Sequence, residues 1–437
     1  MWRFLSLFFF FLLKKIKSEI TIPFKGQNLP LNLNEEELIT TLFYNSYFIN
    51  LTIGSSNQEI LIKIKSTTQL SYIINSNTTS YSGKKFDSEK STTLKVLSKK
   101  NSFTNEDILS GSLVKDSFNF GNTKIDELNF TLTAEIRKES NIQGSGSFGF
   151  GKNVNLATKS KDSILHQLKN MNKINHYTFT LHFTNQNVGN LILGNYLYDL
   201  KKPIYLIETF QEINCNEESD FYYSISSTFY VGDKILSSSN LIFATEIGLI
   251  IGSSDYYNEI EKLYFDDYIK KKKCEKKTFK LNGYYFLNYN EKQFSYFVCD
   301  KDIKINKLPP LIIKNSELSF DIEFTYKDLW FEYNNKLYFL VAFPESYDTD
   351  DFLRFLIGNI IFKKYDISFD SDRKIVGFYD KSKNSTSSKF FYVLLILVIL
   401  IGAFLYLISF IKKYKPRLIK KKTALELEDD GFFTNMK

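Results

Sequence analysis

The stretch of sequence that decides the fold is Phe355-Leu-Ile-Gly-Asn-Ile-Ile-Phe-Lys-Lys-Tyr-Asp-Ile-Ser-Phe-Asp370. Short apolar segments punctuated by turn residues occur here and along most of the chain. Apolar and polar residues alternate in Ile60-Leu-Ile-Lys-Ile64 and in Tyr177-Thr-Phe-Thr-Leu-His-Phe183, which is typical of half-buried β-strands. Helical patterns are few, and the two clearest are Ser163–Lys169 and Tyr256–Phe265. The pattern predicts an all-β protein of the sandwich or barrel class.

The charge of the chain is concentrated at its ends. The formal net charge is +7, and residues 1–18 and 412–437 each contribute +4, so the body between them carries −1. Nucleic-acid binding requires a basic face, and a nearly neutral body argues against it. The excess positive charge lies beside apolar segments, where it acts as a topology signal.

Two apolar segments predict passage through the secretory pathway and a membrane anchor. Phe4–Leu13 follows Arg3 and is too short to span a bilayer, so residues 1–18 are expected to be a signal peptide. The uncharged run Phe390–Ile411 would span roughly 33 Å as a helix, at about 1.5 Å per residue. Lysines and one arginine follow it, so residues 412–437 are expected to be cytoplasmic. This predicts a single-pass type I protein whose body is luminal or extracellular, in the secretory pathway, an endosome or vacuole, or the plasma membrane.

Sequons and cysteines agree with an oxidising compartment. Four Asn-x-Ser/Thr sequons are candidate glycosylation sites: Asn50, Asn77, Asn129 and Asn384. Cys274 and Cys299 are expected to form a disulfide there, which would leave Cys215 free. No Cys-x-x-Cys spacing exists and the three histidines are scattered, so no metal site is expected. No cofactor is expected either, because Asn153 stands where a phosphate-binding loop needs Ser or Thr.

The first half of the body resembles the pepsin-like family of aspartic peptidases. Tyr47-Phe-Ile-Asn-Leu-Thr-Ile-Gly-Ser-Ser-Asn-Gln58 is similar to that family's opening strand, Tyr-x-x-x-Ile-x-Ile-Gly-Thr-Pro-x-Gln. The family then places Asp-Thr-Gly-Ser-x-x-Leu-Trp-Val, and this chain has Lys65-Ser-Thr-Thr-Gln-Leu-Ser-Tyr-Ile73. Phe148-Gly-Phe-Gly151 and Asn190-Leu-Ile-Leu-Gly194 also match in order. The resemblance therefore assigns Lys65 to the first catalytic position.

The second half repeats the resemblance. Leu241-Ile-Phe-Ala-Thr-Glu-Ile-Gly-Leu-Ile-Ile-Gly252 is similar to the family's Ala-Ile-Val-Asp-Thr-Gly-Thr-Ser-Leu-Ile-x-Gly. Ala244 then occupies the second catalytic position, and Glu246 replaces a glycine. The stretch from Phe355 to Asp370, with Ile375-Val-Gly-Phe378 after it, resembles Trp-Ile-Leu-Gly-Asp-x-Phe-Leu-Arg-x-Tyr-Tyr-x-Val-Phe-Asp and Val-Gly-Phe-Ala.

The resemblance implies an all-β, bilobal, pepsin-like acid-protease fold with few short helices, followed by one C-terminal transmembrane helix. The expected segments are a signal peptide at 1–18, an N-terminal segment at 19–41, lobes at 42–200 and 201–380, a stalk at 381–389, the transmembrane helix at 390–411 and the tail at 412–437.

The chemistry of this family needs two carboxylates that share one proton. A protonated lysine at position 65 cannot serve as the general base, and Ala244 has no ionisable atom. Thr67 also replaces a glycine. The resemblance places the flap at Thr104, Asn105, Glu106 and Asp107, so the family's flap tyrosine is missing.

Part of the scaffold is retained. Ser66 and Thr245 keep the hydroxyls that brace the two active-site loops in this family, and Gly149 and Gly358 keep the glycines behind them.

Together with the predicted membrane anchor, these substitutions predict a membrane-anchored pseudopeptidase. Three alternatives remain for its role. The first is a monomer that binds a peptide or protein ligand in the groove between the lobes without cleaving it. The second is an active aspartic endopeptidase with an atypical active site. The third is a structural surface glycoprotein. The first reading follows most directly from the loss of both catalytic aspartates at Lys65 and Ala244.

Overall fold

The computed structural model describes residues 19–30, 32–79, 81–98, 101–102, 108–136, 143–151, 163–185, 187–196, 205–208, 223–281, 292–345, 354–379, 396–397, 399–406 and 408–409. The chain divides into a compact unit that ends at Tyr379 and a second unit, Asp380–Lys437. The expected signal peptide, the four flap residues, Cys215 and Asn384 lie outside the described residues.

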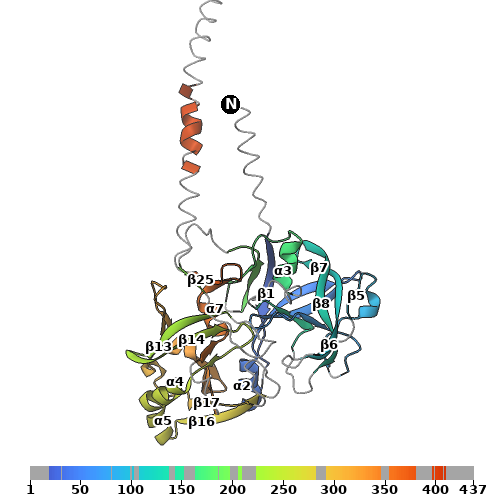
Figure 1. Ribbon diagram of the computed structural model, residues 1–437. Helices are drawn as coiled ribbons and strands as arrows, with labels where there is room; N and C mark the ends of the chain where they lie inside the picture. The colour runs from blue at the N-terminus through green and yellow to red at the C-terminus, as the bar shows by residue number, and fades with distance from the viewer. Residues whose placement is uncertain are drawn as a thin grey trace, which may run out of the picture. The chain divides into compact units, whose positions relative to one another are not determined.

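The first unit is mostly β-structure and contains two sheets, as expected for the bilobal fold (Figure 1). The larger sheet has the order β12-β25-β24-β10-β11-β1-β2-β3-β9-β4-β8-β7-β5, with β6 paired to β7. Its strands are β1 Ile20–Gly26, β2 Tyr47–Ile53, β3 Gln58–Lys65, β4 Tyr72–Ile74, β5 Lys95–Val96, β6 Asn101–Ser102, β7 Ile108–Phe120, β8 Thr123–Ile136, β9 Gly146–Gly149, β10 Thr178–Phe183, β11 Val188–Leu193, β12 Tyr205–Glu208, β24 Asp366–Asp370 and β25 Ile375–Tyr379.

The smaller sheet has the order β19-β18-β13-β14-β23-β15-β22-β17-β21-β20, with β16 paired to β17. Its strands are β13 Ser224–Val231, β14 Lys234–Phe243, β15 Ile250–Ile251, β16 Cys274–Leu281, β17 Lys292–Asp300, β18 Leu311–Lys314, β19 Ile322–Phe324, β20 Trp330–Tyr333, β21 Lys336–Phe339, β22 Val341–Pro344 and β23 Arg354–Ile357.

The helices are short. They are α2 Glu35–Phe43, η1 Ser88–Lys90, α3 Ile164–Asn170, α4 Ser254–Ile260, the π-helical η3 Glu261–Phe265, α5 Asp266–Lys270, η4 Ile305–Lys307, α6 Tyr326–Leu329 and α7 Asn359–Lys364. The predicted helix at 163–169 is confirmed by α3, and the one at 256–265 by α4 and η3. The strands predicted at 60–64 and 177–183 correspond to β3 and β10.

The last strands of the first unit join the sheet that the first half of the chain builds. β24 pairs with β10, and β25 pairs with β24 and β12, all antiparallel. Their alternating apolar side chains are buried, because both faces of these strands are covered. The decisive stretch at residues 355–370 therefore contributes one strand to each sheet, β23 and β24, with α7 between them.

In the second unit the described residues are 396–397, 399–406 and 408–409, and they are helical. Their large apolar side chains are exposed, with Ile396 at 56% and Phe404 at 65%. Within the part of the chain that the structure describes, no helix has both the length and the apolar character needed to cross a membrane. The remainder of the expected span Phe390–Ile411 lies outside that part.

Candidate functional site

Lys65 and Ala244 occupy equivalent places in the two sheets. Lys65 is the last residue of β3, and β3 runs parallel to β9 with Lys65 opposite Gly149. Ala244 directly follows β14, which runs parallel to β23 with Phe243 opposite Ile357. Each position is also held by a backbone hydrogen bond, from Phe150 N to Lys65 O at 2.8 Å and from Ala244 N to Ile357 O at 3.0 Å.

Two glycines let the supporting strands approach the loops that follow these positions. A Cβ added to Gly149 would lie 2.5 Å from the backbone oxygen of Thr68, and one added to Gly358 would lie 2.3 Å from the backbone oxygen of Ile247. Neither distance leaves room for a side chain, so close backbone packing requires glycine at both sites. The two glycines thus support the two loops in the same way.

The hydroxyls of Ser66 and Thr245 connect the two loops directly. Ser66 Oγ donates to Phe243 O at 3.0 Å and accepts from Thr245 N at 3.0 Å. Thr245 Oγ1 donates to Ile64 O at 3.1 Å. Both side chains are fully buried, so these bonds satisfy polar groups that water cannot reach. They join residues about 180 positions apart and fix the two loops against each other.

Lys65 is a buried side chain, with only 8% of its surface exposed. Its Nζ lies 5.7 Å from the centroid of the buried Tyr72 ring, within the range of a cation–π contact. Ala244 is fully buried and has no polar side-chain atom. Thr67, at the position of a family glycine, is also buried. The two expected catalytic positions therefore carry one buried cation and one methyl group.

Glu246 brings a carboxylate to the junction of the loops. Its Oε2 accepts from Ser66 N at 3.3 Å and lies 3.3 Å from Thr245 Oγ1. The side chain is 3% exposed, and burial raises the pKa of the Glu246 carboxyl, while the nearby charges of Lys65 and Lys63 oppose that rise. The sequence shows that Glu246 replaces a glycine. It does not indicate that Lys63 is buried nearby, because the alternating pattern of β3 gives no sign of that burial.

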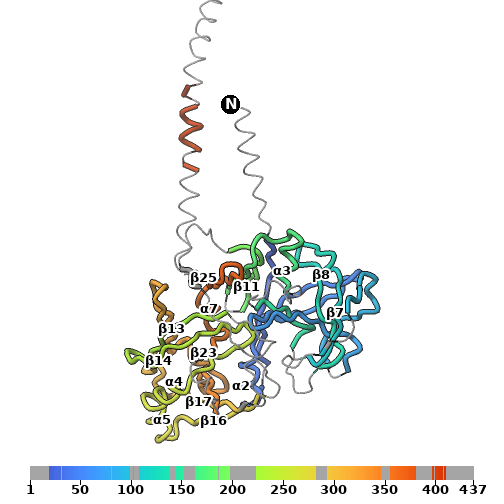
Figure 2. The backbone as a smooth tube through the Cα atoms, in the orientation of Figure 1, coloured from blue at the N-terminus to red at the C-terminus, as the bar shows by residue number. Residues whose placement is uncertain are grey.

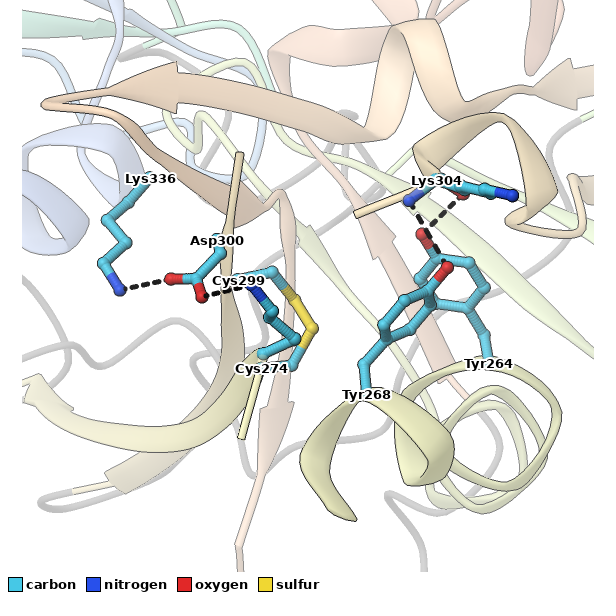
Figure 3. The surroundings of a disulfide bond; sticks show 8 residues. Tyr264, Tyr268, Cys274, Cys299, Asp300, Lys304 and Lys336 are labelled. Atoms are coloured by element: carbon cyan, nitrogen blue, oxygen red, sulfur yellow. Dashed lines mark hydrogen bonds and ion pairs between the residues drawn. A yellow bond between two sulfur atoms is a disulfide. The ribbon is translucent and has the colours of Figure 1, made fainter. Parts of the chain in front are cut away.

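Cys274 and Cys299 form a disulfide between the neighbouring strands β16 and β17, where they are directly paired (Figure 3). The surrounding contacts are polar. Lys336 Nζ donates to Asp300 Oδ1 at 2.8 Å, and Tyr264 OH donates to Lys304 O at 3.1 Å. This bridge lies in the smaller sheet, on strands β16 and β17.

The sequons within the described residues differ in accessibility. Asn50 on β2 and Asn77 in the turn after β4 are exposed, whereas Asn129 on β8 is half-buried. The backbone N–H of Asn129 also donates to Gln167 Oε1 at 2.6 Å. Asn50 and Asn77 are therefore the sites where a glycan would fit with least rearrangement.

Sequence reasoning missed helix α2, which belongs to the site. The sequence analysis predicts only an N-terminal segment at residues 19–41. The signal was present, because Asn34 and Glu37 have the spacing of a capping box and precede an apolar helical face. In the structure Asn34 Oδ1 accepts from Glu37 N, and Glu37 Oε2 accepts from Asn34 N, both at 2.9 Å.

Comparison with known proteins identifies one family. Residues 46–381 match the family model described as eukaryotic aspartyl protease, which covers more than half of the chain. A search of curated proteins found no match. The matched range includes both loops of the site.

Proposed function

Because the chain belongs to the eukaryotic aspartyl protease family, we propose that it is a non-catalytic member, a type I membrane-anchored pseudopeptidase that binds a peptide or protein ligand between its lobes. The observation that carries the proposal is the place of Lys65 and Ala244 at the ends of two equivalent strand pairs.

Glu246 does not replace the missing pair of carboxylates. Hydrolysis by this family needs one carboxylate that activates water and a second carboxyl that protonates the carbonyl oxygen. Glu246 is a single carboxyl, it is buried, and its Oε2 accepts a backbone N–H. Its chemistry suits a structural contact between the loops better than proton transfer to a substrate.

The retained bracing supports a binding role. A protein that does not catalyse hydrolysis does not require, for that reaction, the hydrogen bonds that Ser66 and Thr245 make between the loops. Their retention, with Gly149 and Gly358 behind them, keeps the two lobes in a fixed arrangement. Such a scaffold suits a binding protein. The uncharged run Phe390–Ile411 and the basic residues after it support the membrane anchor.

The proposal is tested with the purified full chain and a mixed peptide library between pH 2 and pH 7. Loss of one general acid or base costs about 10²–10⁴ in rate, and both partners are replaced here, so we expect no pepstatin-sensitive hydrolysis. Immobilised protein should retain a subset of the library peptides uncleaved. Turnover that pepstatin abolishes would mean that the protein is an active peptidase.

A further inference from the structure

Strand β16 is an outer strand of the smaller sheet, and it is longer than the other outer strands. It has eight residues, Cys274–Leu281. In the part of the chain that the structure describes, β17 is the only strand that pairs with it. The other outer strands of the two sheets, β5, β6, β12, β19 and β20, have two to four residues. In Figure 2, β16 runs along the lower margin of the smaller sheet. A long open edge offers its backbone groups to a further strand.

The backbone groups on the open side of β16 follow from its pairing with β17. Asp300 N donates to Lys273 O at 2.8 Å, so the odd-numbered residues of β16 direct their backbone groups toward β17. The open side therefore receives the N–H and C=O groups of the even-numbered residues, which are Cys274, Lys276, Thr278 and Lys280. No described strand pairs with these groups.

The open edge is strongly basic. Residues 270–281 contain seven lysines and one glutamate, a net charge of +6. Lys272 N donates to Ile269 O at 2.9 Å and Lys273 N donates to Tyr268 O at 2.8 Å, and this turn places lysines directly before the strand. Three of the seven lysines form ion pairs with described residues. Within that part of the chain the other four have no ion-pair partner.

The charge selects among the possible occupants of the edge. Lysines on an outer strand oppose pairing with a second copy of the same strand, because the two basic edges repel each other. They favour a strand of opposite charge. Lys276, Thr278 and Lys280 are exposed and lie on one face of β16. Acidic side chains at alternate positions of an added antiparallel strand would lie directly opposite these three residues.

The other face of β16 suits uncharged side chains. Lys277 on that face already donates to Glu35 Oε2 at 2.6 Å, and the Phe279 ring lies 5.9 Å from the Phe43 ring of α2. A cavity of about 380 Å³ is lined by Lys277–Lys280 and by Glu35 and Glu36. Because two glutamates line this cavity, it disfavours further acidic side chains. The two faces together therefore favour an extended peptide in which acidic and uncharged residues alternate.

We propose that the outer edge of β16 binds an extended acidic peptide of a partner protein, which adds an antiparallel strand to the smaller sheet. The backbone groups of its acidic residues pair with the even-numbered residues of β16, and its uncharged side chains face the cavity beside α2. This site lies outside the loops that carry Lys65 and Ala244. The inference therefore goes beyond the proposed function and does not depend on it.

The backbone pairing is tested with the purified full chain and the fluorescein-labelled peptide Val-Glu-Val-Glu-Val-Glu-Val, by fluorescence anisotropy. N-methylation of the glutamate amides removes the donors that face β16, whereas N-methylation of the valine amides removes donors that face away from it. We expect the first change to weaken binding at least about tenfold and the second by less than about threefold. Equal weakening by the two changes, or no binding of the unmodified peptide, overturns the proposal.

The protein side of the contact is tested with two variants of β16. Lys276→Glu with Lys280→Glu reverses the charge of the edge, and Thr278→Pro removes an outward N–H while the pairing with β17 stays complete. Each should weaken binding of the unmodified peptide at least about tenfold. The control Lys25→Glu with Lys124→Glu makes the same charge change at exposed positions of β1 and β8, and it should bind as the wild type does. Wild-type affinity in either β16 variant, or an equal loss in the control, overturns the proposal.

Discussion

At the scale of single residues, Glu246 brings an ionisable group into a buried site. It places a carboxyl at a position where the family has glycine, fully surrounded by protein and close to Lys65 and Lys63. A neutral carboxyl can donate its proton to Thr245 Oγ1, which leaves the Thr245 hydroxyl free to donate to Ile64 O. The hydrogen bonds around Glu246 are therefore compatible with the protonated form that burial favours.

This gives a pH-dependent stability. Burial raises the pKa of Glu246 in the folded state, so its contribution to stability is fully present below the ordinary glutamate pKa of 4.5. That contribution is lost as the pH rises through the raised pKa, because the Glu246 carboxyl ionises more easily in the unfolded chain than in the folded protein. The glutamine in Glu246→Gln cannot ionise. The melting temperature of this variant should therefore rise relative to that of the wild type as the pH increases above 4.5.

The control for this measurement is Glu59→Gln, at an exposed position on β3. Its melting temperature should follow the wild-type profile. The opposite result is a melting temperature of Glu246→Gln that falls relative to the wild type as the pH rises. It would show that the charges of Lys65 and Lys63 affect the pKa of Glu246 more than burial does.

Ser66 gives a second prediction at this scale. Ser66→Ala leaves Thr245 N without its acceptor and Phe243 O without its donor, both buried. We expect the free energy of unfolding to fall by about 1–3 kcal/mol, measured by urea denaturation of the full chain. The exposed Ser56→Ala should change it by less than about 0.5 kcal/mol. Equal effects would mean that the bonds between the loops contribute little.

By its resemblance to the family, the sequence assigns Lys65 and Ala244 to the expected catalytic positions, but it does not indicate what surrounds them. Lys65 and Ala244 follow from a register that matched motifs fix on both sides. The contact of Glu246 with Ser66 joins residues 180 positions apart, and no local pattern indicates such a pairing. Lys63 is buried, with its Nζ 5.9 Å from the centroid of the Tyr44 ring, whereas an alternating strand alone would place it on a polar face.

At the scale of secondary-structure elements, α2 shows a similar limit. Its capping box and its apolar spacing are local, and they predict a helix. The surface on which α2 packs is assembled from β14, β16 and β17, which are more than 190 residues away. The helix could therefore have been predicted from its local sequence, but its place beside Ala244 could not.

The strand pair β16–β17 gives a prediction at the same scale. Cys274 and Cys299 are separated by 25 residues, and a bridge across such a loop contributes roughly 3 kcal/mol in the chain-entropy model. Cys274→Ser with Cys299→Ser should lower the free energy of unfolding by about that amount. Non-reducing peptide mapping should find the bridge in the wild type and in Cys215→Ser. Two free thiols at 274 and 299 in the wild type would contradict the pairing.

At the scale of the whole molecule, the two halves of the chain are joined by shared sheet structure. The chain leaves the smaller sheet after β23. It then forms β24 and β25 in the larger sheet, where β24 pairs with β10 and β25 pairs with β24. The resemblance to the pepsin-like family predicted this bilobal architecture as a unit, because family likeness carries long-range pairing that local patterns do not. The first unit ends at Tyr379, directly after β25, eleven residues before the expected membrane segment begins at Phe390.

The orientation of the chain in a membrane is the last prediction. The run Phe390–Ile411 is long enough to span about 30 Å of hydrocarbon, and the basic residues after it should stay in the cytoplasm. The body should then be glycosylated, and the exposed Asn50 and Asn77 are the best acceptors among the described sequons.

Protease added to intact vesicles should remove residues 412–437 and spare the body, while detergent should expose both. Asn50→Gln and Asn77→Gln should each remove one glycan by gel mobility after glycosidase treatment. A digested body with a protected tail, and no glycan at either site, would require the opposite orientation.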